Sequence, residues 1–528
     1  MMIWIVLSSA SLAGTCPTPE AISARLTDSA CPTLELMSLQ HGADEACMES
    51  GFAPLGLGRV TAVSRDTPPP PGGKQLRDAY GLANTRESAN FALRWGSTHN
   101  LSDSKADYIL ETFETAWEEI LIDLDYVAPQ GSGSYKFNLY MGGTGGPREG
   151  GAAYYSGDSQ GYPMIVITRG TYDDEGYGKT VGAHEFFHAL QGAAGSRYEY
   201  YDGSPGAWYW EATANWVETE IYPENRAQYV SGFLGGFALY PHFSVNFFDY
   251  PDSGSLQEYY QYGAFIFPYY LTREVADASV IRSSWLDSNL SDPLSSLRSI
   301  LSSEWSVDLD EAYFDFAARN ATYRRYDDGD IFSSYVDYYE DYYGNYGDRT
   351  IGTAGPEEDW TDAPSGTLPR TYGSNYLRID AGSEDVVVGF RGAGEGSRGS
   401  TPTWDVRAII VDGNTESEVP VPLTDHRGEA TVPGSAGADE VWLSVTVISG
   451  DNDYNETFAW SYSIGADVGD DTGDPGDDTG SVVDDTADPV DGGGGDKDGR
   501  SGCSALGGAA GWGLVLWAVA AVGLRRRA

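Results

Sequence analysis

The stretch from Gly182 to Gln191 places ionisable side chains inside an otherwise apolar run. It reads GAHEFFHALQ, and its Phe, Ala and Leu residues predict a helix that is buried. His184 and His188 are four residues apart, so on a helix both imidazoles lie on one face, where they can bind one ion. Glu185 is placed beside that face. The pattern H-E-x-x-H therefore predicts a metal site on a buried helix.

A metal site of this type needs a third protein ligand and an open fourth position. The candidate is Glu211, which lies in the sequence WYWEATAN, 23 residues after His188. Pro205 is suited to the first turn of a helix and Pro223 lies beyond its end, so a second helix is predicted over residues 205–222. The interval between the two helices contains no competing His.

The pair of sequences HEFFH and WYWEATAN resembles the gluzincin group of zinc peptidases, which includes thermolysin and the membrane alanyl aminopeptidases. This resemblance implies an α+β zincin-like metallopeptidase domain. It implies that His184, His188 and Glu211 bind one catalytic Zn²⁺ and that Glu185 is the catalytic base. Asn215 stands where thermolysin-like enzymes often have an Asp, and the resemblance implies that it accepts a hydrogen bond from a ligand histidine.

The resemblance also bears on the substrate. The aminopeptidase branch carries a Gly-x-Met-Glu-Asn motif whose Glu captures the substrate α-amine, and the corresponding residues Met141–Gly146 contain no Glu. An endopeptidase is therefore expected, acting on a protein or peptide. The Gly-rich stretch through Gly150, Gly151 and Ala152, followed by Tyr154–Thr168, is expected to supply an edge strand to which an extended peptide adds.

Gluzincins stabilise the oxyanion of the reaction with a Tyr or His downstream of the Glu ligand. Tyr262, in the Tyr-rich segment Tyr259–Phe267, is the favoured candidate for this catalytic role. Tyr259, Tyr260 and His242 are the alternatives.

The charge of the chain excludes one large class of partners. Its net charge of −47 repels phosphate backbones, so no nucleic-acid partner is expected. Residues 466–500 hold 12 Asp and no aromatic residue, which predicts an extended linker without a core. This linker lacks the spacing of a calcium-binding EF-hand loop. Calcium near Asp173 and Asp174 stays open, without support from a motif.

The two ends predict export. Residues 1–13 resemble a secretory signal peptide, and Ala505–Leu524 is long enough to cross a bilayer, with Arg525–Arg527 directly after it. Together with Cys503, this tail resembles the MYXO-CTERM sorting signals of myxobacteria, in which a processing enzyme is expected to act near the Cys. The whole chain then resembles secreted metalloproteases of myxobacteria. The expected location is the cell surface, with outer-membrane anchoring, or the medium.

Between the ends, the predicted secondary structure changes from a mixture of helices and strands to strands alone. Strands are predicted at Phe91–Trp95, Tyr135–Met141 and Met164–Ile167, and a helix from about Ala106 to Leu124. Three of the four Cys lie near the N-terminus and allow one disulfide of unknown pairing. The predicted parts are a signal peptide (1–13), a Cys-containing segment that is a possible pro-segment (14–84), a zinc metallopeptidase domain (85–330), a β-sandwich (345–465), the acidic linker (466–502) and a sorting signal with a transmembrane helix (503–528).

Two other functional classes stay open at this point. One is a non-catalytic surface or adhesion protein with a peptidase-like domain. The other is a zinc hydrolase of non-peptide bonds, which the same ligands could support.

Overall fold

The computed structural model describes most of the chain between residues 73 and 465. The described ranges are 73–200, 203–225, 233–248, 256–327, 329–343, 347–356, 360–450 and 454–465. The predicted signal peptide, the Cys-containing residues up to 72, the acidic linker and the sorting tail lie outside them. The described residues form two compact units, one up to Gly236 with Phe248–Leu309, the other made of Phe237–Phe247 and the residues from Asp310 onward. The protein is therefore of the α+β class, with several sheets.

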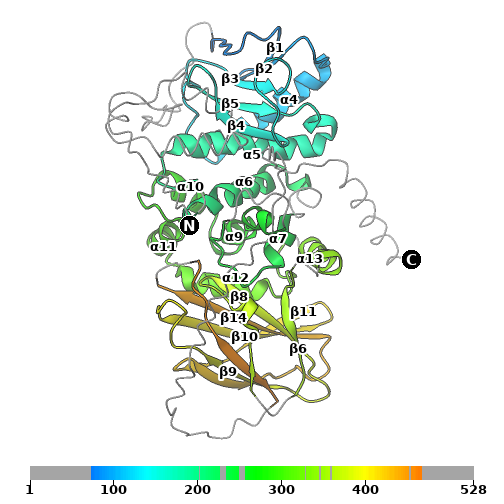
Figure 1. Cartoon of the computed structure of the whole chain (residues 1–528), viewed down its shortest axis with the longest axis vertical. Helices are drawn as coiled ribbons and strands as arrows, with labels where there is room; N and C mark the ends of the chain where they lie inside the picture. The colour runs from blue at the N-terminus through cyan, green and yellow to red at the C-terminus, as the bar shows by residue number, and fades with distance from the viewer. Residues whose placement is uncertain are drawn as a thin grey trace, which may run out of the picture. The chain divides into compact units, whose positions relative to one another are not determined.

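The first unit contains a five-stranded mixed sheet (Figure 1). Its strand order is β1-β2-β3-β5-β4, with β2, β3 and β5 parallel and the outer strands β1 and β4 antiparallel to their neighbours. The strands predicted around β2, β3 and β5 are confirmed. The bounds are β1 (Asn84–Glu87), β2 (Phe91–Trp95), β3 (Phe137–Met141), β4 (Ala153–Gly157) and β5 (Pro163–Ile167).

Helices α4 (Asp103–Ala116) and α5 (Glu175–Ala194) pack on one face of this sheet. Ser102 caps the N-terminus of α4, since its hydroxyl accepts a hydrogen bond from the Lys105 backbone N–H. The helix continues as a π-helical turn, Trp117–Asp123, close to the predicted end. An aromatic cluster fills the space between helices and strands, because the paired residues Phe91 and Phe137 of neighbouring strands face the same side of the sheet. Its members are Phe91, Phe113, Trp117, Phe137 and Phe186.

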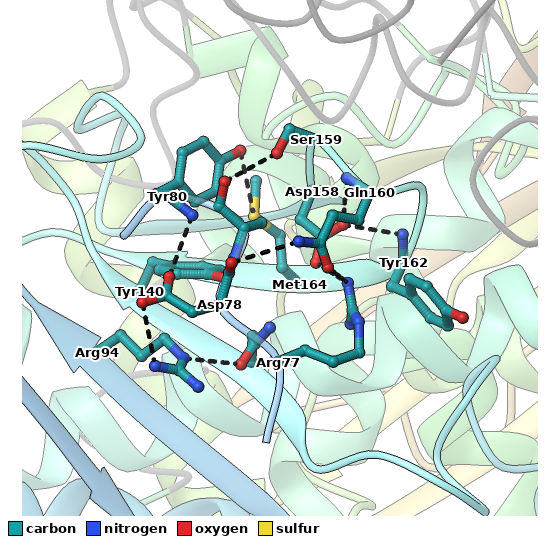
Figure 2. A network of polar contacts seen from close by, with 12 residues as sticks. Arg77, Asp78, Tyr80, Arg94, Tyr140, Asp158, Ser159, Gln160, Tyr162 and Met164 are labelled. Atoms are coloured by element: carbon teal, nitrogen blue, oxygen red, sulfur yellow. Dashed lines mark hydrogen bonds and ion pairs between the residues drawn. The ribbon is translucent and has the colours of Figure 1, made fainter. Parts of the chain in front are cut away.

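The opposite face of the sheet is covered by residues 74–82, called the strap here. Its apolar side chains pack on Tyr140, Tyr154 and Met164. The polar side chains of the strap also bind residues of the sheet and its loops, as Figure 2 shows. Arg77 binds Asp158 at 2.5 Å and lies over the Tyr162 ring at 3.6 Å. The strap is therefore part of the folded unit, although the sequence assigned these residues to the segment before it.

We expect Arg77→Ala to destabilise the first unit by about 2–4 kcal/mol, because it leaves the Asp158 carboxylate buried without a cation. Two backbone N–H groups still bind that carboxylate, which limits the loss. Denaturant unfolding measures the difference. The matched control is Arg86→Ala, which breaks an exposed ion pair with Asp107 and should change stability little. Equal stabilities of the two variants would contradict the role of the strap.

The rest of the first unit is helical. Helix α6 (Ala207–Ile221) packs directly on α5, and the predicted second helix is confirmed. The shorter helices are α7 (Leu234–Ala238), α8 (Tyr260–Gly263), α9 (Ile266–Tyr270), α10 (Ser279–Leu286) and α11 (Pro293–Ile300), of which α7 lies at the boundary of the two units. Among the described residues, no helix is long and apolar enough to cross a bilayer.

The second unit holds two five-stranded sheets that share one apolar core. The core combines Leu377 and Leu443 of one sheet with Val388 and Phe390 of the other. The strand orders are β11-β10-β14-β8-β6 and β12-β13-β9-β15-β7. The bounds are β6 (Thr350–Ala354), β7 (Thr361–Asp362), β8 (Gly373–Ile379), β9 (Val387–Gly392), β10 (Pro402–Asp412), β11 (Thr415–Pro420), β12 (Leu423–Thr424), β13 (Arg427–Thr431), β14 (Glu440–Ser449) and β15 (Trp460–Ile464).

Two helices accompany these sheets. Helix α12 spans Leu309–Arg319. Its Ala318, together with Ala321 just after the helix, packs on Trp442 of β14, at the outer face of the sheet that contains β14. Helix α13 (Gly329–Tyr343) follows. The sequence placed residues up to 330 in the first domain, whereas the contacts of the chain group all but the first residue of α12 with the strands.

Candidate metal centre

Helix α5 carries both histidines and the neighbouring glutamate of the H-E-x-x-H pattern. It begins at Asp174, whose carboxylate accepts a hydrogen bond from the Tyr177 backbone N–H, and it ends at Gly195 in the left-handed conformation. Asp174, near which calcium binding stays open, thus acts as a helix cap. His184 and His188 are 6 % and 3 % exposed, so burying them requires partners for both ring nitrogens.

Helix α6 brings Glu211 to the two histidines. Its Oε2 lies 3.2 Å from Nε2 of His184 and 3.6 Å from Nε2 of His188, and the two Nε2 atoms are 3.1 Å apart. Atoms that bind one divalent ion tetrahedrally, with bonds of about 2.0–2.2 Å, lie about 3.3–3.6 Å from each other. Within the described part of the chain, this is the one group of three side chains that could hold a metal ion.

The protonation of His188 follows from the hydrogen bonds of Gln191. The Gln191 amide NH₂ donates to the Trp210 carbonyl at 3.0 Å and to the Thr213 hydroxyl at 2.9 Å. Its Oε1 must therefore be the atom that faces Nδ1 of His188, at 2.6 Å. An amide oxygen only accepts, so Nδ1 carries the proton and Nε2 presents a lone pair to the site.

The other two ligand side chains are held in the same way. Nδ1 of His184 donates to the Glu218 carboxylate at 2.8 Å, which leaves Nε2 as the atom facing the site. The Tyr200 hydroxyl donates to Oε1 of Glu211, so Oε2 is the oxygen that faces the histidines. Each ligand thus points one lone-pair atom inward.

Three such atoms in contact require a positive charge between them. Burial by itself lowers the pKa of His184, but Glu211 and Glu218 together raise this pKa well above its ordinary value. Burial likewise raises the pKa of Glu211, and His188 and His184 outweigh it, so this pKa falls far below its usual range. Either a proton on His184 or a bound metal ion can supply this positive charge. The residues present suit a metal ion.

Glu185 differs from the three ligand side chains in its hydrogen bonds. It is 4 % exposed, and its Oε2 has no hydrogen-bond partner in the described part of the chain. Burial raises the pKa of Glu185, opposed by the two histidines and by a hydrogen bond from the Tyr155 backbone N–H. A buried carboxylate oxygen without a partner beside a metal site is suited to bind a water molecule or a reacting group.

Tyr155 belongs to β4, the edge strand beside α5. In the β4–β5 pair, hydrogen bonds join Asp158 to Tyr162 and Ala152 to Thr168. Because hydrogen-bonded pairs alternate in an antiparallel ladder, the main-chain groups of Ala153, Tyr155 and Gly157 point away from β5, toward the edge of the sheet. The predicted edge strand therefore lies next to Glu185.

The candidates for oxyanion stabilisation lie in different places. The Tyr262 ring centroid is 6.2 Å from that of His184, and the Phe233 ring stacks on Tyr262 with centroids 5.3 Å apart. Tyr260 is the first residue of α8, two positions before Tyr262, and Tyr259 is the residue before that helix. His242 belongs to the second unit, where its ring contacts Phe243. Tyr262 thus stays a prediction.

The prediction for Asn215 is wrong. Its amide NH₂ donates to the Tyr262 carbonyl at 3.2 Å, and neither ligand histidine binds it. The reason is helix geometry: at 100° per residue, position 218 lies about 20° from Glu211 around α6, whereas position 215 lies about 40° away on the other side. Glu218, two turns after Glu211, reaches His184 instead.

Sequence reasoning missed the residues that hold the ligands: Glu218, Gln191 and Tyr200. Two of them left a signal. Glu218 is an acidic residue seven positions after Glu211, and Gln191 follows His188 by three, so each lies on the same helix face as a ligand. Tyr200 comes from the loop before α6, and no spacing rule points to it.

A protein family model matches this chain. It is described as a family of unknown function, DUF6055, and its match covers residues 74–460, from the start of the strap to the first residue of β15. A comparison with curated proteins finds no match. Because the match spans most of the sequence and nearly all the described residues, the chain belongs to the DUF6055 family.

Proposed function

We propose that this protein is a zinc-dependent endopeptidase of the gluzincin type, with its catalytic site in the first unit. The observation that carries the proposal is the convergence of His184, His188 and Glu211 beside the unpartnered oxygen of Glu185. Two imidazoles and one carboxylate are the ligand set of catalytic zinc sites that keep one position open.

In this proposal each residue has one task. When bound, zinc supplies a Lewis acid that polarises the substrate carbonyl and lowers the pKa of water to about 7. Glu185 takes the proton from the attacking water with its unpartnered oxygen and passes it to the leaving amine. Tyr262 is the proposed donor to the oxyanion, on the basis of the resemblance and its ring contact with His184.

The peptide substrate would bind along β4. The outward main-chain groups of Ala153 and Gly157 are free of the β4–β5 ladder, and an extended peptide can add to them as a further strand. Tyr155 lies between these two residues and binds Glu185, which brings a peptide on this edge close to the base. An edge strand of this kind favours a polypeptide over a small-molecule substrate.

The proposed place of action is outside the cell, at the surface or after release. This part rests on the predicted signal peptide of residues 1–13 and the tail from Cys503, both outside the described residues. A membrane contact through the tail, before its processing, belongs to the same proposal.

The test is cleavage of an unfolded protein substrate by the purified whole chain. We expect cleavage at internal peptide bonds, its loss after a chelator removes the metal, and its recovery with one equivalent of zinc. Mass spectrometry of the products identifies internal cleavage. Zinc binding without cleavage of any peptide would refute the peptidase and leave hydrolysis of another bond, and a folded chain that takes up no zinc would favour the adhesion protein.

A further inference from the structure

We propose that Glu218 and Tyr200 are positioning residues of the metal centre, each holding one ligand from outside. This inference rests on the proposed function only for the identity of the ion. Each ligand side chain has two atoms that could bind a metal, and in each the atom turned away from the centre is bound by a separate partner. The pairs are Glu218 with His184, Gln191 with His188, and Tyr200 with Glu211.

The partners of the two histidines differ in charge. His184 donates to a carboxylate, whereas His188 donates to a neutral amide. A carboxylate behind an imidazole increases the electron density on the metal-binding nitrogen, so His184 should be the stronger donor. Glu218 is itself 4 % exposed, and its hydrogen bond to His184 holds the carboxylate in a fixed place.

Gln191, the partner of His188, is itself held in place by several hydrogen bonds. Its NH₂ binds the Trp210 carbonyl and the Thr213 hydroxyl, and that hydroxyl also accepts from the Trp285 indole at 3.2 Å. The Thr213 hydroxyl donates in turn to the Tyr209 carbonyl. Replacing Gln191 would therefore disturb the contact of α5 with α6 as well as His188, and it does not isolate the metal centre.

Tyr200 acts on the carboxylate ligand. Its hydroxyl binds Oε1 of Glu211, and its ring is held against Trp210 at 6.0 Å and Phe248 at 5.5 Å. A carboxylate bound on one oxygen by a fixed donor offers the other oxygen to the ion. Tyr200 thus favours binding through one oxygen, which leaves more of the coordination sphere to the substrate.

The test is the zinc dissociation constant of the whole chain, measured by competition with a chelator. Glu218→Leu should weaken zinc binding about 100-fold, and Glu218→Gln about 10-fold, because an amide oxygen can still accept as Gln191 does. Tyr200→Phe should weaken it about 10-fold. The controls are Glu220→Gln on the same helix and Tyr198→Phe, a buried tyrosine that binds the Ser284 carbonyl, and both should stay within twofold of wild type.

A purely structural role would lower the thermal stability of the zinc-free protein, so that stability is measured alongside. The proposal requires a similar zinc-free melting temperature and a shifted Co²⁺ absorption spectrum in Glu218→Gln, which is close in shape to the wild type. It is overturned if Glu218→Gln and Tyr200→Phe bind zinc as tightly as the controls. If zinc affinity falls as expected while no variant and no wild-type protein cleaves peptides, the proposed function fails and the positioning roles stand.

Discussion

Glu185→Gln is expected to reduce the peptidase rate by about 10²- to 10⁴-fold, the usual contribution of a general base. The side chain keeps its shape, but an amide cannot take a proton from water. Because His184, His188 and Glu211 are unchanged, zinc content should stay near one per chain. The rate is measured as kcat/KM on a fluorogenic peptide, and zinc by plasma mass spectrometry.

The control for this prediction is Glu175→Gln, an exposed glutamate in the first turn of the same helix. It should keep wild-type activity and zinc. If Glu185→Gln retained wild-type activity, the assignment of the base would be wrong, whereas a loss of zinc from this variant would mean that Glu185 serves the metal rather than the reaction.

Glu211→Gln is expected to weaken zinc binding by roughly 10²- to 10⁴-fold, since breaking a buried charge pair costs about 3–5 kcal/mol. The variant keeps an oxygen toward the Tyr200 hydroxyl but removes the negative charge that the ion and the histidines face. Peptidase activity at a fixed low zinc concentration should fall with the zinc content. Excess zinc should restore part of it.

The control is Glu220→Gln on the same helix, which changes a partly exposed carboxylate that is paired with Arg273. Its zinc affinity should equal that of the wild type. Equal affinities of Glu211→Gln and Glu220→Gln would remove Glu211 from the ligand set and, with it, the three-ligand site on which the proposed function depends.

The fold was predictable where local patterns are strong. The strand at Tyr135–Met141 and the helix from about Ala106 are predicted from neighbouring residues, and the structure confirms both as β3 and α4. The limit of the first unit was less predictable. The strap joins it through Arg77 and Asp158, which are 81 residues apart, and no local pattern reports a contact at that separation.

The sequence by itself determined the three ligand candidates and the base, because the H-E-x-x-H spacing indicates His184, His188 and Glu185, and the segment WYWEATAN indicates Glu211. Only the tertiary structure decided which side chains hold them. Whether Asn215 or Glu218 reaches His184 depends on the rotation of α6 against α5, and Tyr200 depends on the path of a loop. These contacts come from the packing of separate elements, about which the order of residues within each element carries little information.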